Sequence, residues 1–115
     1  MKIIVICTGN TCRSPMAEAL IKNKFPDEDV ISRGLYVAIP SGPSKNAFEI
    51  MNEMGFDIKK HISCQLDENE VNEADLLLTM TKSQKAKILS VVPEAEGKIF
   101  TLCEYAGVEG EISDP

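Results

Sequence analysis

The stretch CTGNTCRSP, residues 7–15, most constrains the fold because it joins two different structural signals. Residues 2–7 (KIIVIC) form an apolar run, β-branched through Ile6, which is typical of a strand buried on both faces. Ser14 and Pro15 favour a helix directly afterwards, with Ser14 as its N-cap and Pro15 at its first position. A buried strand that leads through a short loop into a helix predicts a βαβ unit and a parallel sheet.

The same alternation continues along the chain. Apolar runs at 75–80 and 98–102, and a run at 30–37 that Gly34 interrupts, predict further strands. Ligands of such parallel sheets bind beyond the carboxyl ends of the strands, which is where residues 7–15 lie. Helices are expected over about 14–25, around 47–54, as a short acidic segment within 67–74, and from a capping box at Thr81 and Gln84 to Pro93, with a loop after the last strand.

Length and composition limit the class of protein. With 115 residues, 43% of them hydrophobic, the chain suits one domain, 1–115, with a single core. The net charge of −6 argues against broad binding to nucleic acid or to an anionic membrane. The apolar run at the start is too short for a signal peptide, and no stretch is long enough to cross a membrane. We therefore expect a cytoplasmic protein.

The four cysteines are expected to be free thiols, because disulfides are rare in that compartment. The spacing of Cys7 and Cys12, without a second pair of Cys or His residues, is a poor zinc signature. Neither a metal nor an organic cofactor is expected. Cys64 and Cys103 are expected to be small buried residues.

Residues 7–14 have the chemistry of an anion-binding loop. The N–H groups at a helix N-terminus converge, and the helix dipole favours an anion there. Gly9 permits backbone angles that other residues avoid, and Asn10 tolerates the left-handed region. Arg13 supplies a charged fork that suits a tetrahedral oxyanion. Such a loop also stabilises a thiolate, so Cys7 is the candidate nucleophile toward a bound phosphate.

At these residues the sequence resembles the low-molecular-weight protein tyrosine phosphatase family, whose loop reads C-x-G-N-x-C-R-S-P. The segments MAEAL (16–20), GFDIKKHIS (55–63), ADLLLTM (74–80) and SDP (113–115) are also similar to the family, so the resemblance covers essentially the whole chain. It implies a three-layer α/β fold, with a four-stranded parallel sheet flanked by helices. The family continues past its Asp-Pro pair with another helix, which we expect to be missing because the sequence ends at Pro115.

The resemblance also implies a metal-free phosphatase reaction in two steps. Cys7 would attack phosphorus and form a phosphocysteine. Asp114 would protonate the leaving group and then activate the water that hydrolyses the intermediate. Ser14 would donate a hydrogen bond to the Cys7 sulfur, and Asn10 would fix the loop. The residues expected to bind phosphate are Thr8, Gly9, Asn10, Thr11, Cys12, Arg13 and Ser14.

Thr11 bears on the choice of substrate. Family members that act on phosphotyrosine usually carry an apolar residue at this loop position, which suits a phenyl ring. Thr11 instead offers a hydroxyl and narrows the pocket, and CTGNTCRSP looks like the protein arginine phosphatase branch. The leading hypothesis is therefore hydrolysis of phosphoarginine in proteins, where Thr11 could orient the flat guanidinium. The opposing interpretation is an ordinary threonine that braces the loop backbone.

Two alternative functions stay open. The chain could be a protein tyrosine phosphatase of the same family, or a phosphoryl-binding module that truncation after Pro115 has made inactive. Arsenate reductases share the loop but need two further cysteines near the third strand, and residues 77–89 contain none.

The sequence also predicts roles for Cys12 and His61, and the partners of the chain. Cys12 is expected to form a reversible disulfide with Cys7 that shields it from over-oxidation. His61, the only histidine, is expected to make a structural hydrogen bond rather than act as a base. The expected partners are a phosphorylated protein substrate and inorganic phosphate in the loop, and the chain is expected to be a monomer.

Overall fold

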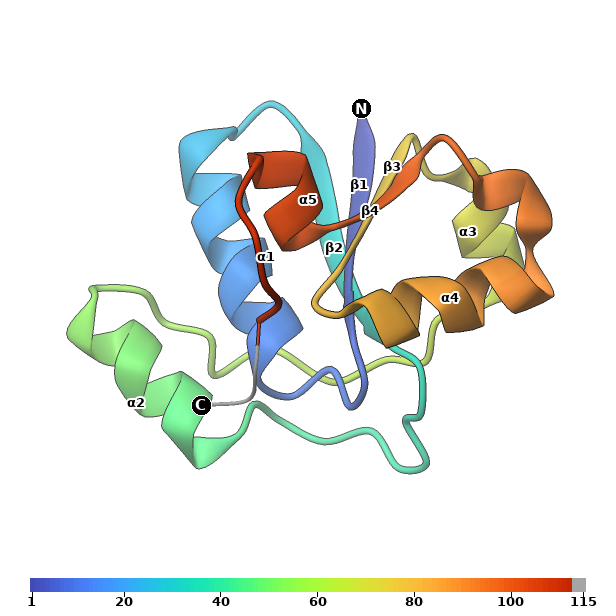
Figure 1. Cartoon of the computed structure of the whole chain (residues 1–115). Helices are drawn as coiled ribbons and strands as arrows, with labels where there is room; N and C mark the ends of the chain where they lie inside the picture. The colour runs from blue at the N-terminus through green and yellow to red at the C-terminus, as the bar shows by residue number, and fades with distance from the viewer. Residues whose placement is uncertain (113–115) are drawn as a thin grey trace.

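The computed structural model describes residues 1–112, so the candidate acid Asp114 lies outside the described residues. Strands and helices alternate as the sequence predicts (Figure 1). The elements are β1 (Lys2–Cys7), α1 (Arg13–Lys24), β2 (Asp29–Gly34), α2 (Lys45–Glu53), α3 (Glu68–Glu73), β3 (Leu76–Thr79), α4 (Lys82–Val91), the 3₁₀ turn η1 (Pro93–Ala95), β4 (Ile99–Thr101) and α5 (Leu102–Ala106).

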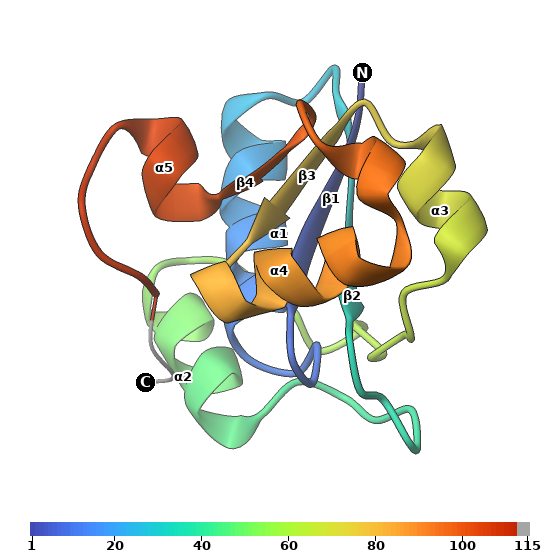
Figure 2. The ribbon, with the colours of Figure 1, turned by 45° about the vertical axis from the view of Figure 1, so that its right-hand side comes forward.

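Within residues 1–112 the strands form one four-stranded parallel sheet in the order β2-β1-β3-β4. In the register, Lys2 lies opposite Asp29 on β2, and Ile3 lies opposite Leu76 on β3. Helices α1 and α5 cover one face of the sheet, and α3 and α4 cover the other (Figure 2). Helix α2 packs against α1 on its outer side. The predicted three-layer α/β fold is confirmed.

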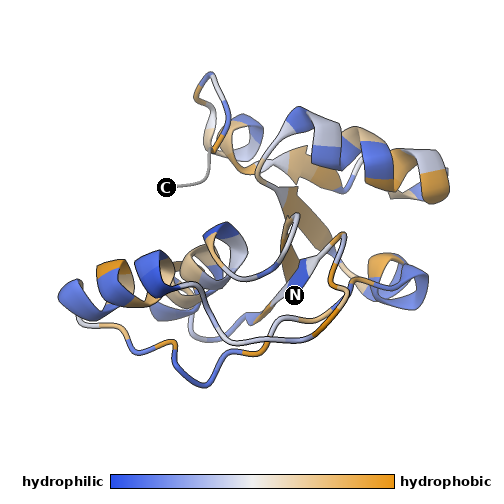
Figure 3. Cartoon of the chain, turned by 90° about the horizontal axis from the view of Figure 1, so that it is seen from below, coloured by the Kyte–Doolittle hydropathy of each residue, from blue (hydrophilic) through white to orange (hydrophobic). Residues whose placement is uncertain are grey.

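The alternation of side chains along β1 supplies both halves of the core. Ile4 and Ile6 face α3 and α4, whereas Ile3, Val5 and Cys7 face α1 and α5. Figure 3 shows the strands as a hydrophobic layer between helices that carry both hydrophilic and hydrophobic residues. Each buried aliphatic side chain stabilises the fold by about 1.5–3 kcal/mol, so β1 is fixed firmly in the sheet. Within the described residues no helix is both long and apolar enough to cross a membrane.

Two element boundaries differ from the prediction near the loop. Strand β2 ends at Gly34 and not at residue 37, although the N–H groups of Leu35 and Tyr36 still donate to the carbonyls of Cys7 and Thr8. Gly34 also pairs with residues 64–66 on its other side. Helix α1 begins at Arg13, and its N-cap position is Cys12 rather than Ser14. The Ser14 hydroxyl does not cap the helix because it bonds to side chains of the loop, described below.

Helix α5 occupies a region predicted to be a loop. A capping box opens it, in which the Thr101 hydroxyl accepts from the Glu104 N–H and the Glu104 carboxylate accepts from the Thr101 N–H. The bond from the Thr101 N–H, followed by the nearby Lys85 ammonium, lowers the pKa of Glu104. Gly107 ends the helix in the left-handed region, with φ 77°.

Candidate active site

The loop between β1 and α1 lies at the point where the strand order reverses. The chain passes from β1 through α1 to β2 on one side, and β3 lies on the other side of β1. In open parallel sheets, ligands bind outside the carboxyl ends of the strands at such a switch point. The N-terminus of α1 adds converging N–H groups and the positive end of a helix dipole to the same place.

The sulfur of Cys7 receives two hydrogen bonds from this loop. The Asn10 N–H donates to Sγ at 3.2 Å, and the Ser14 Oγ lies 3.0 Å from Sγ. The Asn10 Nδ2 donates to the Ser14 Oγ at 2.8 Å, which leaves the Ser14 proton available for the sulfur. Cys7 is 2% exposed, so water competes little for these hydrogen bonds.

The Asn10 side chain is the centre of the loop's hydrogen-bond network. It is fully buried, and its Nδ2 donates both to Ser14 and to the Ser32 Oγ on β2, at 3.0 Å. Its Oδ1 accepts from the Cys64 N–H at 2.8 Å. Its backbone carbonyl accepts from the His61 Nε2 at 2.7 Å, so the structural role predicted for His61 is confirmed.

The backbone geometry of the loop differs from the prediction at Gly9. Among the described residues, Asn10 is the non-glycine residue with positive φ (56°), whereas Gly9 is not among the positive-φ glycines. The glycine that the loop needs for close approach is Gly34, at the end of β2. A Cβ atom at Gly34 would lie 3.0 Å from the Thr8 carbonyl oxygen and 3.0 Å from the Asn10 Cβ. Gly34 therefore lets the loop and β2 come together.

Arg13 reaches across the loop to the C-terminal part of the described chain. Its Nη1 donates to the backbone carbonyl of Ile112 at 2.8 Å. The Ile112 N–H in turn donates to the Met80 carbonyl at 3.0 Å, just beyond β3. The guanidinium is thus oriented at the N-terminus of α1, where it can hold an oxyanion together with the loop N–H groups.

Three other predicted residues of the loop contact neighbouring elements. The Thr11 carbonyl accepts from the Ser44 N–H at 2.7 Å, which ties the loop to the start of α2. The exposed Thr8 accepts a hydrogen bond through Oγ1 from the Gln84 Nε2 at 3.1 Å. Cys12 is half-buried, is a free thiol, and packs against the contact between α1 and α2. The disulfide between Cys7 and Cys12 stays a prediction.

The two remaining cysteines, Cys64 and Cys103, differ in their exposure. Cys103 in α5 is buried, as predicted. Cys64 was predicted to be buried and this is wrong, because its side chain is exposed. The part of Cys64 that matters to the site is its backbone N–H, which holds Asn10.

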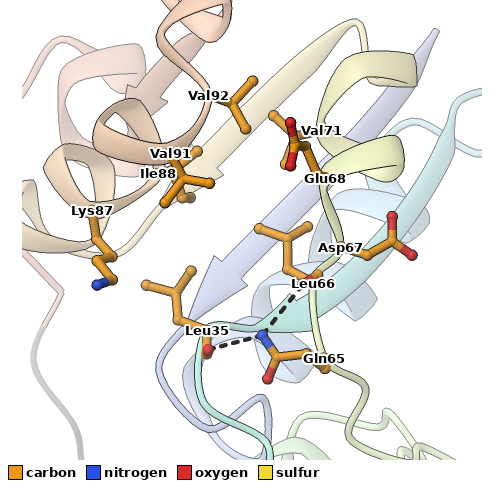
Figure 4. Close-up of a pocket in the computed structure, with 10 residues that line it drawn as sticks. All are labelled: Leu35, Gln65, Leu66, Asp67, Glu68, Val71, Lys87, Ile88, Val91 and Val92. Atoms are coloured by element: carbon orange, nitrogen blue, oxygen red, sulfur yellow. Dashed lines mark hydrogen bonds between the residues drawn. The ribbon is translucent and has the colours of Figure 1, made fainter.

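A groove elsewhere on the molecule is separate from this loop. It lies between α3 and α4 and encloses about 210 Å³ (Figure 4). Its apolar walls include Leu35, Leu66, Val71 and Ile88, whereas none of residues 7–14 lines it. Polar and charged side chains also line the groove, namely Gln65, Asp67, Glu68 and Lys87. The candidate active site is the loop.

The chain is similar to known proteins over almost its whole length. Residues 2–115 match the family described as low molecular weight phosphotyrosine protein phosphatase. A protein-arginine-phosphatase of Geobacillus stearothermophilus is 41% identical, over 99% of this chain and 78% of the relative. The low molecular weight protein-tyrosine-phosphatase PtpB of Staphylococcus epidermidis is 38% identical, over 100% of this chain and 81% of the relative.

A solved structure superposes closely on the described fold. It is the YwlE arginine phosphatase in the form of its C7S mutant with a phosphorylated active-site serine. It has a TM-score of 0.90 and 39% identity to this chain, and the match covers all of this chain and 78% of that structure.

Proposed function

Since the chain belongs to the low molecular weight phosphotyrosine protein phosphatase family, whose members act on phosphorylated proteins through a cysteine, we propose that it hydrolyses phosphoarginine and that Cys7 is its nucleophile. The observation that carries the assignment of Cys7 is the pair of hydrogen bonds to its sulfur from the Asn10 N–H and Ser14. A buried cysteine sulfur with these hydrogen bonds, beside a helix N-terminus and an arginine, is placed to attack a phosphoryl group held by the same loop.

In the first step the Cys7 thiolate attacks phosphorus, an S–P bond forms, and the P–N bond to the guanidine breaks. Asp114 gives its proton to the departing nitrogen. Arg13 and the N–H groups of residues 8–14 stabilise the charge on the non-bridging oxygens. In the second step Asp114 takes a proton from water, the water oxygen attacks phosphorus, and the Cys7 thiolate leaves with Ser14 as its hydrogen-bond donor. Inorganic phosphate is released.

A relative supports the covalent step. The YwlE C7S mutant carries a phosphorylated active-site serine, so in that protein a phosphoryl group resides on the side chain that replaces a cysteine. The loop of this chain has a cysteine at residue 7, held by the contacts described above. We therefore assign the phosphocysteine intermediate to Cys7.

The position of Ile112 supports Asp114 as the acid. Ile112 contacts Arg13 through its carbonyl, and Asp114 follows it by two residues in the sequence. Two residues span at most about 7 Å of chain. A carboxyl group tethered that closely to the Arg13 contact is a suitable acid for a leaving group bound in the loop.

The contacts of Thr11 support phosphoarginine as the substrate. Its carbonyl, not its side chain, braces the loop by accepting from Ser44. Within residues 1–112 the Thr11 hydroxyl makes no hydrogen bond, so it is available to accept one from a guanidinium N–H. The similarity to a protein-arginine-phosphatase, at 41% identity, supports the same substrate.

The second candidate substrate is phosphotyrosine. PtpB of Staphylococcus epidermidis, at 38% identity, is named a tyrosine phosphatase. The test is to measure kcat/KM on a phosphoarginine peptide and on a phosphotyrosine peptide of the same sequence, with the wild type, Thr11→Ile and Cys7→Ser. We expect the wild type to prefer phosphoarginine, Thr11→Ile to reverse or flatten the preference, and Cys7→Ser to release no phosphate.

The possible outcomes test the substrate, the turnover and the nucleophile separately. A wild-type preference for phosphotyrosine would overturn the phosphoarginine assignment and leave the nucleophile in place. Binding of phosphate without turnover on either peptide would favour the phosphoryl-binding module. Turnover by Cys7→Ser would remove Cys7 as the nucleophile.

A further inference from the structure

Gln84 joins the active-site loop to the turn between β3 and α4. Its Oε1 accepts from the N–H groups of Met80 and Thr81, at 2.9 and 3.1 Å. Its Nε2 donates to the Thr8 Oγ1 at 3.1 Å. Gln84 is 5% exposed, so its amide group is largely shielded from water. The side chain therefore holds the carboxyl ends of β1 and β3 in a fixed relation.

The same turn also holds the C-terminal part of the described chain. The Met80 carbonyl accepts from the Ile112 N–H at 3.0 Å, and the Ile112 carbonyl accepts from Arg13 at 2.8 Å. The Ile112 side chain packs against the apolar cluster that contains Met80. A connected path thus runs from Thr8 through Gln84 and Met80 to Ile112, and from there back to the loop at Arg13.

The need for a helix cap does not explain the amide at residue 84. A capping box requires only an acceptor at this position, and glutamate serves as well as glutamine. Helices α3 and α5 have the same box with a glutamate, Glu70 and Glu104, in the equivalent position. A glutamine accepts the two bonds of the turn and also donates to the Thr8 hydroxyl, whereas a glutamate could only accept from that hydroxyl. The Gln84 amide therefore gives the active-site loop a hydrogen bond that the helix cap does not require.

We propose that Gln84 is a positioning residue of the phosphatase reaction. It sets the distance between the loop that holds the phosphoryl group and the turn that holds the Ile112 segment, which leads to the acid Asp114. This inference rests on the proposed function, since it needs Asp114 to protonate the leaving group. It assigns Gln84 an effect on protonation and not on phosphate binding, because Asn10 and Gly34 hold the loop independently.

The test compares Gln84→Met with the wild type on two aryl phosphates. Phenyl phosphate has a leaving group that needs a proton, whereas 2,4-dinitrophenyl phosphate has one that departs without it. The measured quantity is kcat/KM, which covers binding and the first chemical step. We expect Gln84→Met to lose about tenfold or more on phenyl phosphate and less than about twofold on the dinitrophenyl ester. Competitive inhibition by inorganic phosphate should stay unchanged.

Two other variants control for a general loss of structure. Thr8→Val breaks the same hydrogen bond from the other side and keeps the α4 capping box, so it should show the same selectivity. Glu104→Met removes the equivalent capping side chain from α5 and should lower thermal stability without selectivity between the two esters. Equal losses on both esters in Gln84→Met, or weaker phosphate inhibition in proportion, would overturn the inference.

A further comparison separates this inference from the proposed function. Asp114→Asn should show the leaving-group selectivity more strongly than Gln84→Met. If Asp114→Asn shows it and Gln84→Met and Thr8→Val do not, the role of Gln84 is wrong and the acid stands. If Asp114→Asn shows none, the assignment of the acid is wrong and the role of Gln84 is overturned with it.

Discussion

The Arg13 guanidinium donates through Nη1 to the Ile112 carbonyl, 2.8 Å away and 99 residues later in the sequence. The bond fixes the guanidinium from outside its own loop, while the N-terminus of α1 fixes its backbone. A guanidinium group held in this way loses little conformational freedom when it binds an oxyanion. In the proposed reaction, Arg13 would therefore be oriented for a planar, two-point contact with phosphate before the substrate binds.

This arrangement predicts that Arg13→Lys loses most of the activity. A lysine keeps the charge but cannot make two parallel hydrogen bonds to the non-bridging oxygens. We expect kcat/KM on a phosphorylated peptide to fall by about 10²- to 10³-fold. The matched control is Arg33→Lys, in which the arginine pairs with Glu70 of α3, and it should stay within about twofold of the wild type. Comparable losses in the two variants would argue against a specific role for Arg13.

The contacts of the Cys7 sulfur predict that Cys7→Ser separates binding from turnover. A serine hydroxyl can keep the contacts with the Asn10 N–H and Ser14, but it does not ionise near neutral pH. We expect no steady-state phosphate release, with inorganic phosphate or vanadate still bound when titrated in a calorimeter. Cys103→Ser, at a buried thiol in α5, should keep turnover. Loss of oxyanion binding in Cys7→Ser would contradict this separation.

The local part of the site could be predicted from the sequence, and the distant part could not. Residues 7–15 are contiguous, so the strand end, the loop and the helix start can be seen together. The partners of Asn10 come from positions 32, 61 and 64, which belong to β2 and to a loop after α2. Apolar periodicity places a strand in a layer, but it does not specify hydrogen bonds between side chains of different elements.

Some signals were present in the sequence but were ambiguous. Ser14 followed by Pro15 fits a helix cap, yet in the structure the Ser14 hydroxyl serves Cys7 and Asn10. The box T-L-C-E at 101–104 marks the start of α5, but a helix of five residues is too short to show a helical period. In the sequence, Gly34 only interrupts an apolar run. The structure shows that Thr8 and Asn10 leave no room for a side chain at this position.

The network around Asn10 predicts a selective defect for Asn10→Asp. An aspartate has nearly the same shape, tolerates the left-handed region, and can still accept from the Cys64 N–H. It cannot donate, so the Ser14 and Ser32 hydroxyls would turn to the new carboxylate, and the sulfur of Cys7 would lose the Ser14 proton. We expect kcat to fall about 10- to 100-fold, equivalent to the roughly 1–3 kcal/mol of a hydrogen bond to a charged group.

The matched measurement for this variant is the free energy of unfolding in urea. Asn10→Asp should cost about 1–3 kcal/mol, because a buried carboxylate replaces a satisfied amide. Ser14→Ala should lower kcat in a similar way with less effect on stability, since it removes the sulfur donor without burying a charge. An unchanged kcat in both variants would show that the hydrogen bond from Ser14 to the sulfur does not contribute to turnover.

The contact of β2 with the loop predicts that Gly34→Ala damages both stability and activity. The new Cβ would lie 2.6 Å from the Val37 Cγ2, which can rotate away, but also 3.0 Å from the Thr8 carbonyl and from the Asn10 Cβ, which cannot. The loop would have to move away from β2, and the bonds of Asn10 to Ser32 would stretch. We expect about 1–3 kcal/mol of destabilisation and at least about a tenfold loss of kcat/KM.

Gly42→Ala provides the control for Gly34→Ala, because its nearest neighbour would be the His61 carbonyl at 3.9 Å, an ordinary contact. It should leave both unfolding and kcat/KM within experimental error of the wild type. Unfolding is measured in urea, and activity on a phosphoarginine peptide at a temperature where each variant is fully folded. If Gly34→Ala unfolds more easily but keeps full activity at that temperature, the loop does not depend on its close approach to β2. A combined loss would show that the end of β2 sets the shape of the phosphate-binding loop.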